Sequence, residues 1–276
     1  MRALWQRFTL IGRLSLLALL VLFLVALLAP MIAPHDPTET NLHLRLAQSP
    51  GYPLGCDQDG QCLFSRLVYG TRLTLLIGFL ARGLALLVGV GIGLAAGFWG
   101  GWIDWLLMRV VDVFLAFPSL LLAIAISMVL GQGVATVILA IAVVGWAETA
   151  RIVRGAALEI RGAEFVMAAR ALGASDLRIM LTHILPNCLP LITVIFAMGM
   201  ATAILSEASL SFLGLGVDLS QPTWGSMVSL GRDYLIPHPR LSLYPGLCIG
   251  LVVILFNVLG DELRDLLDPG RKGQMT

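Results

Sequence analysis

Six apolar runs, each about long enough to cross a lipid bilayer, dominate this sequence and limit the folds that it can adopt. The hydrocarbon core of a bilayer is about 30 Å thick, so a helix needs about 20 apolar residues to span it. The backbone polar groups of a spanning segment must be satisfied internally, which favours helices. The sequence therefore predicts an all-α membrane protein with about six transmembrane helices, over Leu14–Ala33, Leu73–Phe98, Leu106–Leu130, Val134–Ala150, Leu189–Leu213 and Leu243–Gly260.

The composition agrees with a multi-pass membrane protein. Hydrophobic residues make up 58% of the 276 residues and charged residues only 13%, and the mean hydropathy is +0.90, which a soluble domain does not reach. The formal net charge is +1, whereas a protein that binds nucleic acid needs a dense basic surface. Membrane lipid is therefore the expected environment, and nucleic acid is not an expected partner.

The basic residues near the ends of the runs predict the orientation in the membrane, because cytoplasmic segments carry an excess of Lys and Arg. With the N-terminus inside, the inner segments carry most of the arginines, and the outer side carries only Arg45, Arg66, Arg72, Arg232 and Arg240. Both termini are then cytoplasmic, which requires an even number of spans. The outer side holds two substantial segments, residues 34–72 and 214–242, and the largest inner segment is residues 151–187.

The beginning of the chain fits two interpretations. The first run follows Arg2, Arg7 and Arg13, as the apolar part of a cleaved secretory signal would. Its length, and Pro30 and Pro34 where small residues would mark cleavage, favour a retained span. Residues 1–12 are then expected to lie along the membrane surface. We divide the chain into 1–72 (surface segment, first span and outer loop), a five-helix core at 73–268 and a cytoplasmic tail at 269–276.

The inner segment contains a polar interruption that predicts two short helices. Ala168, Ala169 and Leu172 favour helix, Gly173 is a typical helix stop, and Ser175 is a candidate N-cap for a second helix. The small alanine surface could approach a groove on another protein closely. The alternative is an ordinary amphipathic surface helix followed by the entry of the next span.

This interruption resembles the cytoplasmic loop through which membrane subunits of bacterial ATP-binding cassette importers engage their ATPase. The resemblance rests on the spacing of Ala168, Ala169 and Gly173, followed by Ile184-Leu185-Pro186. Met167 stands where that family has Glu, so the polar contact of that Glu is not carried over. The loop, about residues 156–187, would couple to the ATPase through Glu164, Phe165, Ala168, Ala169, Arg170, Leu172, Gly173, Ala174, Ser175, Ile184, Leu185 and Pro186.

Further stretches narrow the resemblance to the C-type membrane subunit of the dipeptide, oligopeptide and nickel permease group. There are four such stretches. They are Pro53-Leu54-Gly55 and the residues that follow it as far as Leu67; Met108 to Asp112 with Phe117-Pro118-Ser119; Glu207 to Gly216 with Trp224-Gly225; and Phe256 to Asp261 with the residues that follow as far as Pro269. Such a protein is a type I importer-like permease in the bacterial inner membrane. It moves solute by alternating access and has no ATPase site of its own.

The resemblance also implies partners and a solute class. The partners are a second, related membrane subunit, two cytoplasmic subunits that bind ATP and Mg²⁺, and an extracytoplasmic solute-binding protein, while this chain carries no cofactor. Small peptides are the first expectation for the solute, with nickel, glutathione or opine-like solutes as alternatives. A secondary transporter or channel is the alternative of a different class, although the spans show few ionisable residues at the midplane and no internal repeat.

Several polar residues within or near the spans need separate interpretations. Arg109 and Asp112 stand three apart on one helical face and can pair, which favours a structural role. Pro118 is expected to kink its helix, and the kink belongs either to a gate or to a packing accommodation. Glu207, with Ser211 beside it, belongs either to an outer gate or translocation path or to a structural hydrogen-bond site. Arg82 has no acidic residue within a helical turn, so it either snorkels or pairs with another span or subunit.

The cysteines and histidines complete the candidates. Cys56 and Cys62 lie in the outer loop, where two thiols this close either form a disulfide or stay free. The four histidines are scattered without metal-ligand spacing, so no metal site is expected. Gly89, Gly93 and Gly97 recur every four residues and predict a smooth helix face for close helix packing.

Overall fold

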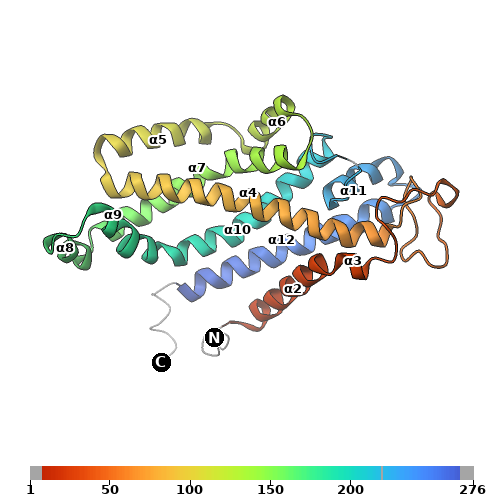
Figure 1. Ribbon diagram of the computed structural model, residues 1–276, viewed down its shortest axis with the longest axis horizontal. Coiled ribbons are helices and arrows are strands. Elements are labelled where there is room, and N and C mark those ends of the chain that lie inside the picture. Colours follow the sequence, from red (N-terminus) through yellow and green to blue (C-terminus); the bar gives the residue numbers. More distant parts are fainter. Residues whose placement is uncertain (1–7, 219, 268–276) are drawn as a thin grey trace.

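Long helices that run side by side along one axis form the body of the protein (Figure 1). The computed structural model describes residues 8–218 and 220–267. The helices are α2 (Leu10–Leu27), α3 (Ala29–Ile32), α4 (Leu63–Trp99), α5 (Gly101–Ala116), α6 (Ser119–Leu130), α7 (Val134–Arg161), α8 (Glu164–Ala171), α9 (Asp176–Ile179), α10 (Leu185–Phe212), α11 (Trp224–Gly231) and α12 (Arg240–Leu267). Short 3-10 turns cover Leu42–Leu44 and Arg232–Tyr234, and a π-helical turn at Met180–Ile184 joins α9 to α10.

The described residues contain the membrane-spanning helices that the apolar runs predict. Five helical segments are long and apolar enough to span a bilayer, and a sixth span forms if α5 and α6 count as one. The fold class is thereby confirmed. Most spans extend beyond their apolar runs, because α4 begins at Leu63, α7 continues to Arg161 and α12 covers Arg240–Leu267. Hydropathy marks only the membrane-embedded part of a helix, whereas helical hydrogen bonding continues into polar sequence.

The third span differs from the predicted continuous helix over Leu106–Leu130. It consists of α5 and α6, which meet at an angle of 87°. Phe117 between them is extended, with ψ 139°, as a residue before proline prefers. Pro118 has no backbone N–H to continue the hydrogen-bond ladder of α5. The expected kink is therefore a complete break, and Figure 1 shows α6 turned away from the axis of α5.

Helices α4 and α7 are in extensive contact, and glycines allow them to approach closely. A Cβ atom added to Gly89 would lie 2.6 Å from the Trp146 carbonyl oxygen. A Cβ on Gly93 would lie 2.6 Å from the Ala150 carbonyl oxygen, and one on Gly97 would lie 2.7 Å from the Ala157 Cβ. The predicted glycine stripe is thus confirmed as the surface on which α7 packs.

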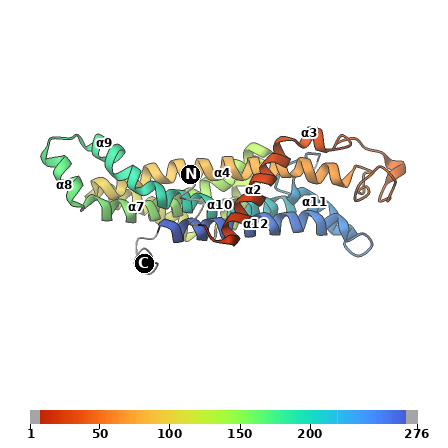
Figure 2. The ribbon, with the colours of Figure 1, turned by 90° about the horizontal axis from the view of Figure 1, so that it is seen from below.

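The two ends of the described chain lie together. The backbone N–H of Thr9, just before α2, donates to Glu262 Oε2 in the last turns of α12 at 3.2 Å, and the Thr9 hydroxyl also bonds to this carboxylate. Figure 2 shows α2 crossing α12 obliquely. These contacts place the start of the first span and the end of the last span on the same side. Residues 1–7 of the expected surface segment and the expected tail at 269–276 fall outside the described residues.

Candidate functional site: docking loop, polar networks and core cavity

The loop that contains α8 and α9 is anchored to the helical body by apolar side chains. Val166 in α8 is 1% exposed and Ile179 in α9 is 0% exposed. Both belong to a buried cluster with Phe98, Val153 and Ile184, contributed by α4, α7 and the π-turn. Burial of two such side chains stabilises the loop by about 1.5–3 kcal/mol each. Figures 1 and 2 show α8 and α9 together at one end of the long axis.

The turn between α8 and α9 has the backbone pattern of a Schellman C-cap. Gly173 has φ +82°, a conformation that glycine adopts without a Cβ penalty. The N–H of Ala174 donates to the Ala169 carbonyl oxygen at 3.1 Å, and the N–H of Gly173 donates to the Arg170 carbonyl oxygen at 3.0 Å. These two bonds satisfy carbonyl groups that the end of a helix otherwise leaves open. The short α8, the turn at Gly173 and the short α9 agree with the expected local structure.

An apolar surface at this end of the molecule faces outward, and we call it the docking surface. It consists of Phe165, Met167, Ala168, Leu172 and Leu177. Leu172 is 88% exposed, Leu177 59% and Met167 56%. Since the spans are on the other side of this loop, the exposed side chains are not explained by contact with the lipid core. Several exposed apolar side chains on one short loop are typical of a protein interaction site.

Two charged residues lie beside the docking surface. Other residues predicted to couple to the ATPase pack against the buried apolar cluster instead. Glu164 and Arg170 are exposed, and the Arg170 guanidinium lies 5.7 Å from the centre of the Phe98 ring. Ile184 is fully buried, while Ala169, Ala174 and Leu185 are half-buried and pack against the same cluster. Ser175 has the extended N-cap backbone without a capping hydroxyl bond, and Pro186 is exposed in the first turn of α10. The inward residues hold the surface in place.

The predicted Arg109–Asp112 pair belongs to a larger charge network between α5 and α7. Arg109 Nη1 lies 3.8 Å from Asp112 Oδ2, whereas Arg151 Nη2 lies only 2.5 Å from Asp112 Oδ1. A second pair joins the same helices, because Arg154 donates to both oxygens of Asp104, with 2.6 Å from Nη2 to Oδ2. Sequence reasoning found only the local partner, since Arg151 is 39 residues from Asp112.

Glu207 lies in an enclosed hydrogen-bond network near the outer end of α10. Its side chain is fully buried. Glu207 Oε1 accepts from the hydroxyls of Ser211 and Thr223, each at 2.8 Å. Thr223 also caps α11, where its Oγ1 accepts from the Ser226 N–H at 3.0 Å. The network therefore fastens the end of α10 to α11, which favours the structural interpretation of Glu207 and Ser211. Pro118, placed with them in the sequence as a gate candidate, is exposed at the α5–α6 break.

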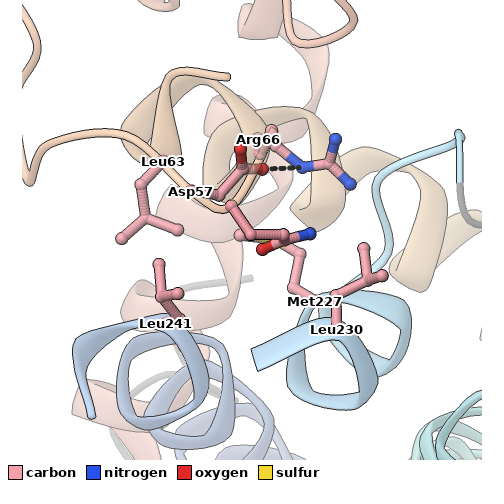
Figure 3. Close-up of a pocket in the computed structure, with 7 residues that line it drawn as sticks. Asp57, Leu63, Arg66, Met227, Leu230 and Leu241 are labelled. Atoms are coloured by element: carbon pink, nitrogen blue, oxygen red, sulfur yellow. Dashed lines mark ion pairs between the residues drawn. The ribbon is translucent and has the colours of Figure 1, made fainter. Parts of the chain in front are cut away.

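The outer loop is held on α4 by a buried ion pair, shown in Figure 3 among apolar side chains of α4, α11 and α12. Arg66 Nε lies 3.4 Å from Asp57 Oδ2, and the two side chains are 2% and 6% exposed. Burial raises the pKa of Asp57 above its ordinary value, although the Arg66 charge and the N–H groups of Gln61 and Asp59 lower it. Loss of either partner would leave a buried charge uncompensated.

The outer loop brings Cys56 and Cys62 together. They face each other as a β-bridge pair, and both are buried free thiols in the structure. The pKa of the Cys56 thiol is raised mainly by burial, and a higher pKa lowers the fraction of reactive thiolate. A disulfide between the two stays a prediction. Among the described residues, no group of three or more His, Cys, Asp or Glu side chains could hold a metal ion.

Arg82 lies at the middle of α4 and bonds to two other helices. It is 7% exposed, its Nη2 donates to the Ile195 carbonyl oxygen at 3.0 Å and its Nη1 to the Gly145 carbonyl oxygen at 3.5 Å. It lines a cavity of about 190 Å³ between α4, α6, α7 and α10, together with Glu148. Arg82 therefore does not snorkel, and Glu148 faces the same cavity.

The chain belongs to the family of inner membrane components of binding-protein-dependent transport systems. The model of that family matches residues 89–273, which is most of the chain and includes the docking loop. A second model, the N-terminal transmembrane domain of oligopeptide transport permease C, matches residues 11–50. The two matches confirm the resemblance to a C-type permease and place the chain in the inner membrane as a multi-pass protein.

Curated relatives match over nearly the whole chain. The dipeptide transport system permease protein DppC of Alkalihalophilus pseudofirmus is 44% identical over 95% of this chain and 87% of its own length. The glutathione transport system permease protein GsiD of Escherichia coli is 41% identical over 98% of this chain and 90% of its own length. A putative peptide transport system permease protein of Brucella suis is 44% identical over 94% of this chain and 88% of its own length.

The fold also matches a solved transporter. A chain from an inward-facing conformation of the MetNI methionine ABC transporter superposes with a TM-score of 0.60 at 21% identity, over 74% of this chain and 96% of that chain. At this identity the match concerns the fold, and it identifies a type I ABC importer permease architecture.

Proposed function

We propose that this chain forms one half of the transmembrane pore of an ATP-driven importer for small peptides. A second, related membrane subunit forms the other half, and two cytoplasmic subunits bind and hydrolyse ATP with Mg²⁺. A binding protein on the outer side delivers the solute. The chain itself contributes no ATPase site, so its part is to receive a movement at the docking loop and convert it into a change of access.

The observation that carries this proposal is the docking surface. Leu172 is 88% exposed, and Met167 and Leu177 of the same loop are also more than half exposed, whereas Val166 and Ile179 are buried. Several exposed apolar side chains on one loop are typical of a surface that a partner covers. Its position after α8 and before Gly173 coincides with the loop spacing of the importer family.

The supporting helices suggest how the movement travels. Asp176–Phe212 is helical throughout and crosses the bilayer as one span. It begins in the docking loop and ends beside Thr223, which Glu207 binds at 2.8 Å. ATP-driven closure of the two ATPase subunits would shift the docking loop, and α10 would carry the shift toward the outer side. Two arrangements of the pore, open outward or inward, are sufficient for alternating access.

The proposed solute rests on the relatives. Two relatives at 44% identity are named as dipeptide or peptide permeases, and one at 41% as a glutathione permease. Glutathione is itself a small peptide, so both names agree with a peptide-sized solute. Uptake of labelled dialanine and of labelled glutathione by vesicles that contain the complete complex separates the two candidates.

The test uses the tagged chain purified with its partners in mild detergent. The Leu172→Arg variant places a charge on the docking surface, and Ile236→Arg is the matched control, because Ile236 is 94% exposed in the outer loop. We expect an ATPase subunit to co-purify with the wild type and with Ile236→Arg, and to be lost from Leu172→Arg. The docking proposal fails if Leu172→Arg retains the ATPase. Solute transport without ATP by the isolated wild-type chain would establish the secondary transporter instead.

A further inference from the structure

Two oppositely charged side chains, Arg82 and Glu148, line one cavity between α4, α6, α7 and α10. Arg82 is the twentieth residue of α4, about 28 Å from Leu63 at 1.5 Å per residue. Glu148 is near the middle of α7, and Gly199, which also lines the cavity, is near the middle of α10. The cavity is therefore near the middle of three spanning helices, the depth at which transporters hold their solutes.

The structure surrounds the guanidinium group of Arg82 with glycines and backbone acceptors. A Cβ atom on Gly199 would lie 1.8 Å from Arg82 Nε, and one on Gly145 would lie 3.5 Å from Arg82 Nη1. Two carbonyl oxygens accept from Arg82, at Gly145 and Ile195. Arg82 Nε has no hydrogen-bond partner. A guanidinium offers five N–H donors, so donors remain beyond the two carbonyl bonds, and Glu148 attracts the positive charge without forming an ion pair with it.

Glu148 supplies the negative charge in the same cavity. It is exposed, and among the described residues neither it nor Arg82 takes part in an ion pair. Ionisable groups at this depth are costly unless they face water or a partner. Ser119, Thr202 and Ser206 line the same cavity, and Ser119 and Thr202 are exposed. The cavity thus has an enclosed cationic side and an accessible anionic side with hydroxyl groups between them.

We propose that this cavity binds the two charged ends of a zwitterionic small peptide during translocation, with Arg82 holding the carboxylate and Glu148 the ammonium group. The inference rests on the proposed function, which it extends to a contact site within the pore. A volume of about 190 Å³ is smaller than the 300–1,000 Å³ of typical ligand pockets. It therefore admits a solute of about two small residues, and a longer one would project through the open side.

A structural role of Arg82 makes a different prediction. As a link between α4, α7 and α10, Arg82 would affect all solutes equally, because it would act through helix packing. As a carboxylate-binding residue, it would discriminate between a free and an amidated C-terminus. A charge-assisted hydrogen bond to a carboxylate is strong enough to change affinity by at least about tenfold.

The experiment measures binding of labelled dialanine to the purified complex in detergent, without the binding protein, in competition with dialanine amide and N-acetyl-dialanine. We expect the wild type to bind dialanine at least about tenfold more tightly than either analogue. The Arg82→Gln variant should lose the preference over the amide, and Glu148→Gln should lose the preference over the acetylated peptide. Arg72→Gln, an exposed arginine on the same helix, should keep both preferences.

The outcomes separate this inference from the function on which it rests. A wild type without either preference, or an Arg82→Gln variant that keeps the preference over the amide, overturns the inference. If Arg82→Gln does not assemble, Glu148→Gln decides, since Glu148 is exposed and its replacement removes no packing contact of the core. Failure of the ATPase to co-purify, or of ATP to drive uptake, would instead overturn the proposed function.

Discussion

The contact between α4 and α7 should respond very differently to two neighbouring glycine substitutions. A Cβ atom on Gly93 would lie 2.6 Å from the Ala150 carbonyl oxygen and 2.9 Å from the Val153 Cβ, whereas one on Gly91 would have no atom within 4 Å. Ordinary contact begins near 3.4 Å, so the Gly93→Ala variant requires a shift of about 0.8 Å at the Ala150 carbonyl oxygen. The obstacle is backbone, which moves only if the whole of α7 moves.

The magnitude follows from two opposing effects. Replacing glycine by alanine within a helix stabilises it by about 0.5–1 kcal/mol, because the unfolded chain loses less freedom on folding. Overpacking a close contact destabilises by about 1–3 kcal/mol. Gly91→Ala is therefore expected to be neutral or stabilising. Gly93→Ala is expected to lose up to about 2 kcal/mol net, which lowers the melting temperature by several degrees, at about 2–4 °C per kcal/mol.

A thiol-reactive fluorogenic dye provides the assay, because the chain carries its own reporters. Cys56 and Cys188 are buried, at 0% and 1% exposure, and react when the protein unfolds. Melting curves of the two variants and the wild type in the same detergent give the comparison. Equal melting temperatures for Gly91→Ala and Gly93→Ala would refute the conclusion that glycine sets the distance between α4 and α7.

Three further predictions concern the outer side. Trp224→Phe removes the indole N–H that donates to the Leu67 carbonyl oxygen at 3.1 Å, and we expect it to lose about 1 kcal/mol in thermal or denaturant unfolding. Because the pKa of Asp57 is raised in the folded state, protonation of Asp57 stabilises the folded protein. This contribution is fully present below the unfolded pKa and is lost as the pH rises through the folded pKa. The melting temperature of the wild type minus that of Asp57→Asn should therefore increase as the pH is lowered from about 7 to about 4. A difference that does not change with pH would contradict this. In the folded protein, maleimide should not label Cys56 or Cys62, which are 0% and 1% exposed, and rapid labelling would show that the loop opens.

The sequence predicted the spans and the docking turn because both depend on local signals. Apolar runs of about 20 residues and the glycine spacing of α4 are visible without a structure. Gly173 predicted the end of α8, and the structure gives it φ +82°. The spans and the turn at Gly173 are each determined by residues that are close together in the sequence. They can therefore be predicted without knowing which distant residues they contact.

The break between α5 and α6 and the environment of Arg82 were not predictable in the same way. Hydropathy continues through Phe117 and Pro118, so the sequence indicated one helix where the structure has an angle of 87°. Proline explains the interruption but not its size, which depends on where α6 packs. Arg82 bonds to a carbonyl oxygen 113 residues away, and backbone acceptors carry no sequence signature.

The π-turn at Met180–Ile184 determines which changes in chain length this protein can absorb. Ile179 and Ile184 are both buried in one apolar cluster, although residues five apart in a regular helix point about 140° away from each other. The bond from the Leu185 N–H to the Met180 carbonyl oxygen accommodates one surplus residue in this turn. A one-residue deletion here would leave an ordinary α-helical spacing and keep the docking surface facing as before. The same deletion in the middle of α7 would rotate every residue beyond it by about 100°.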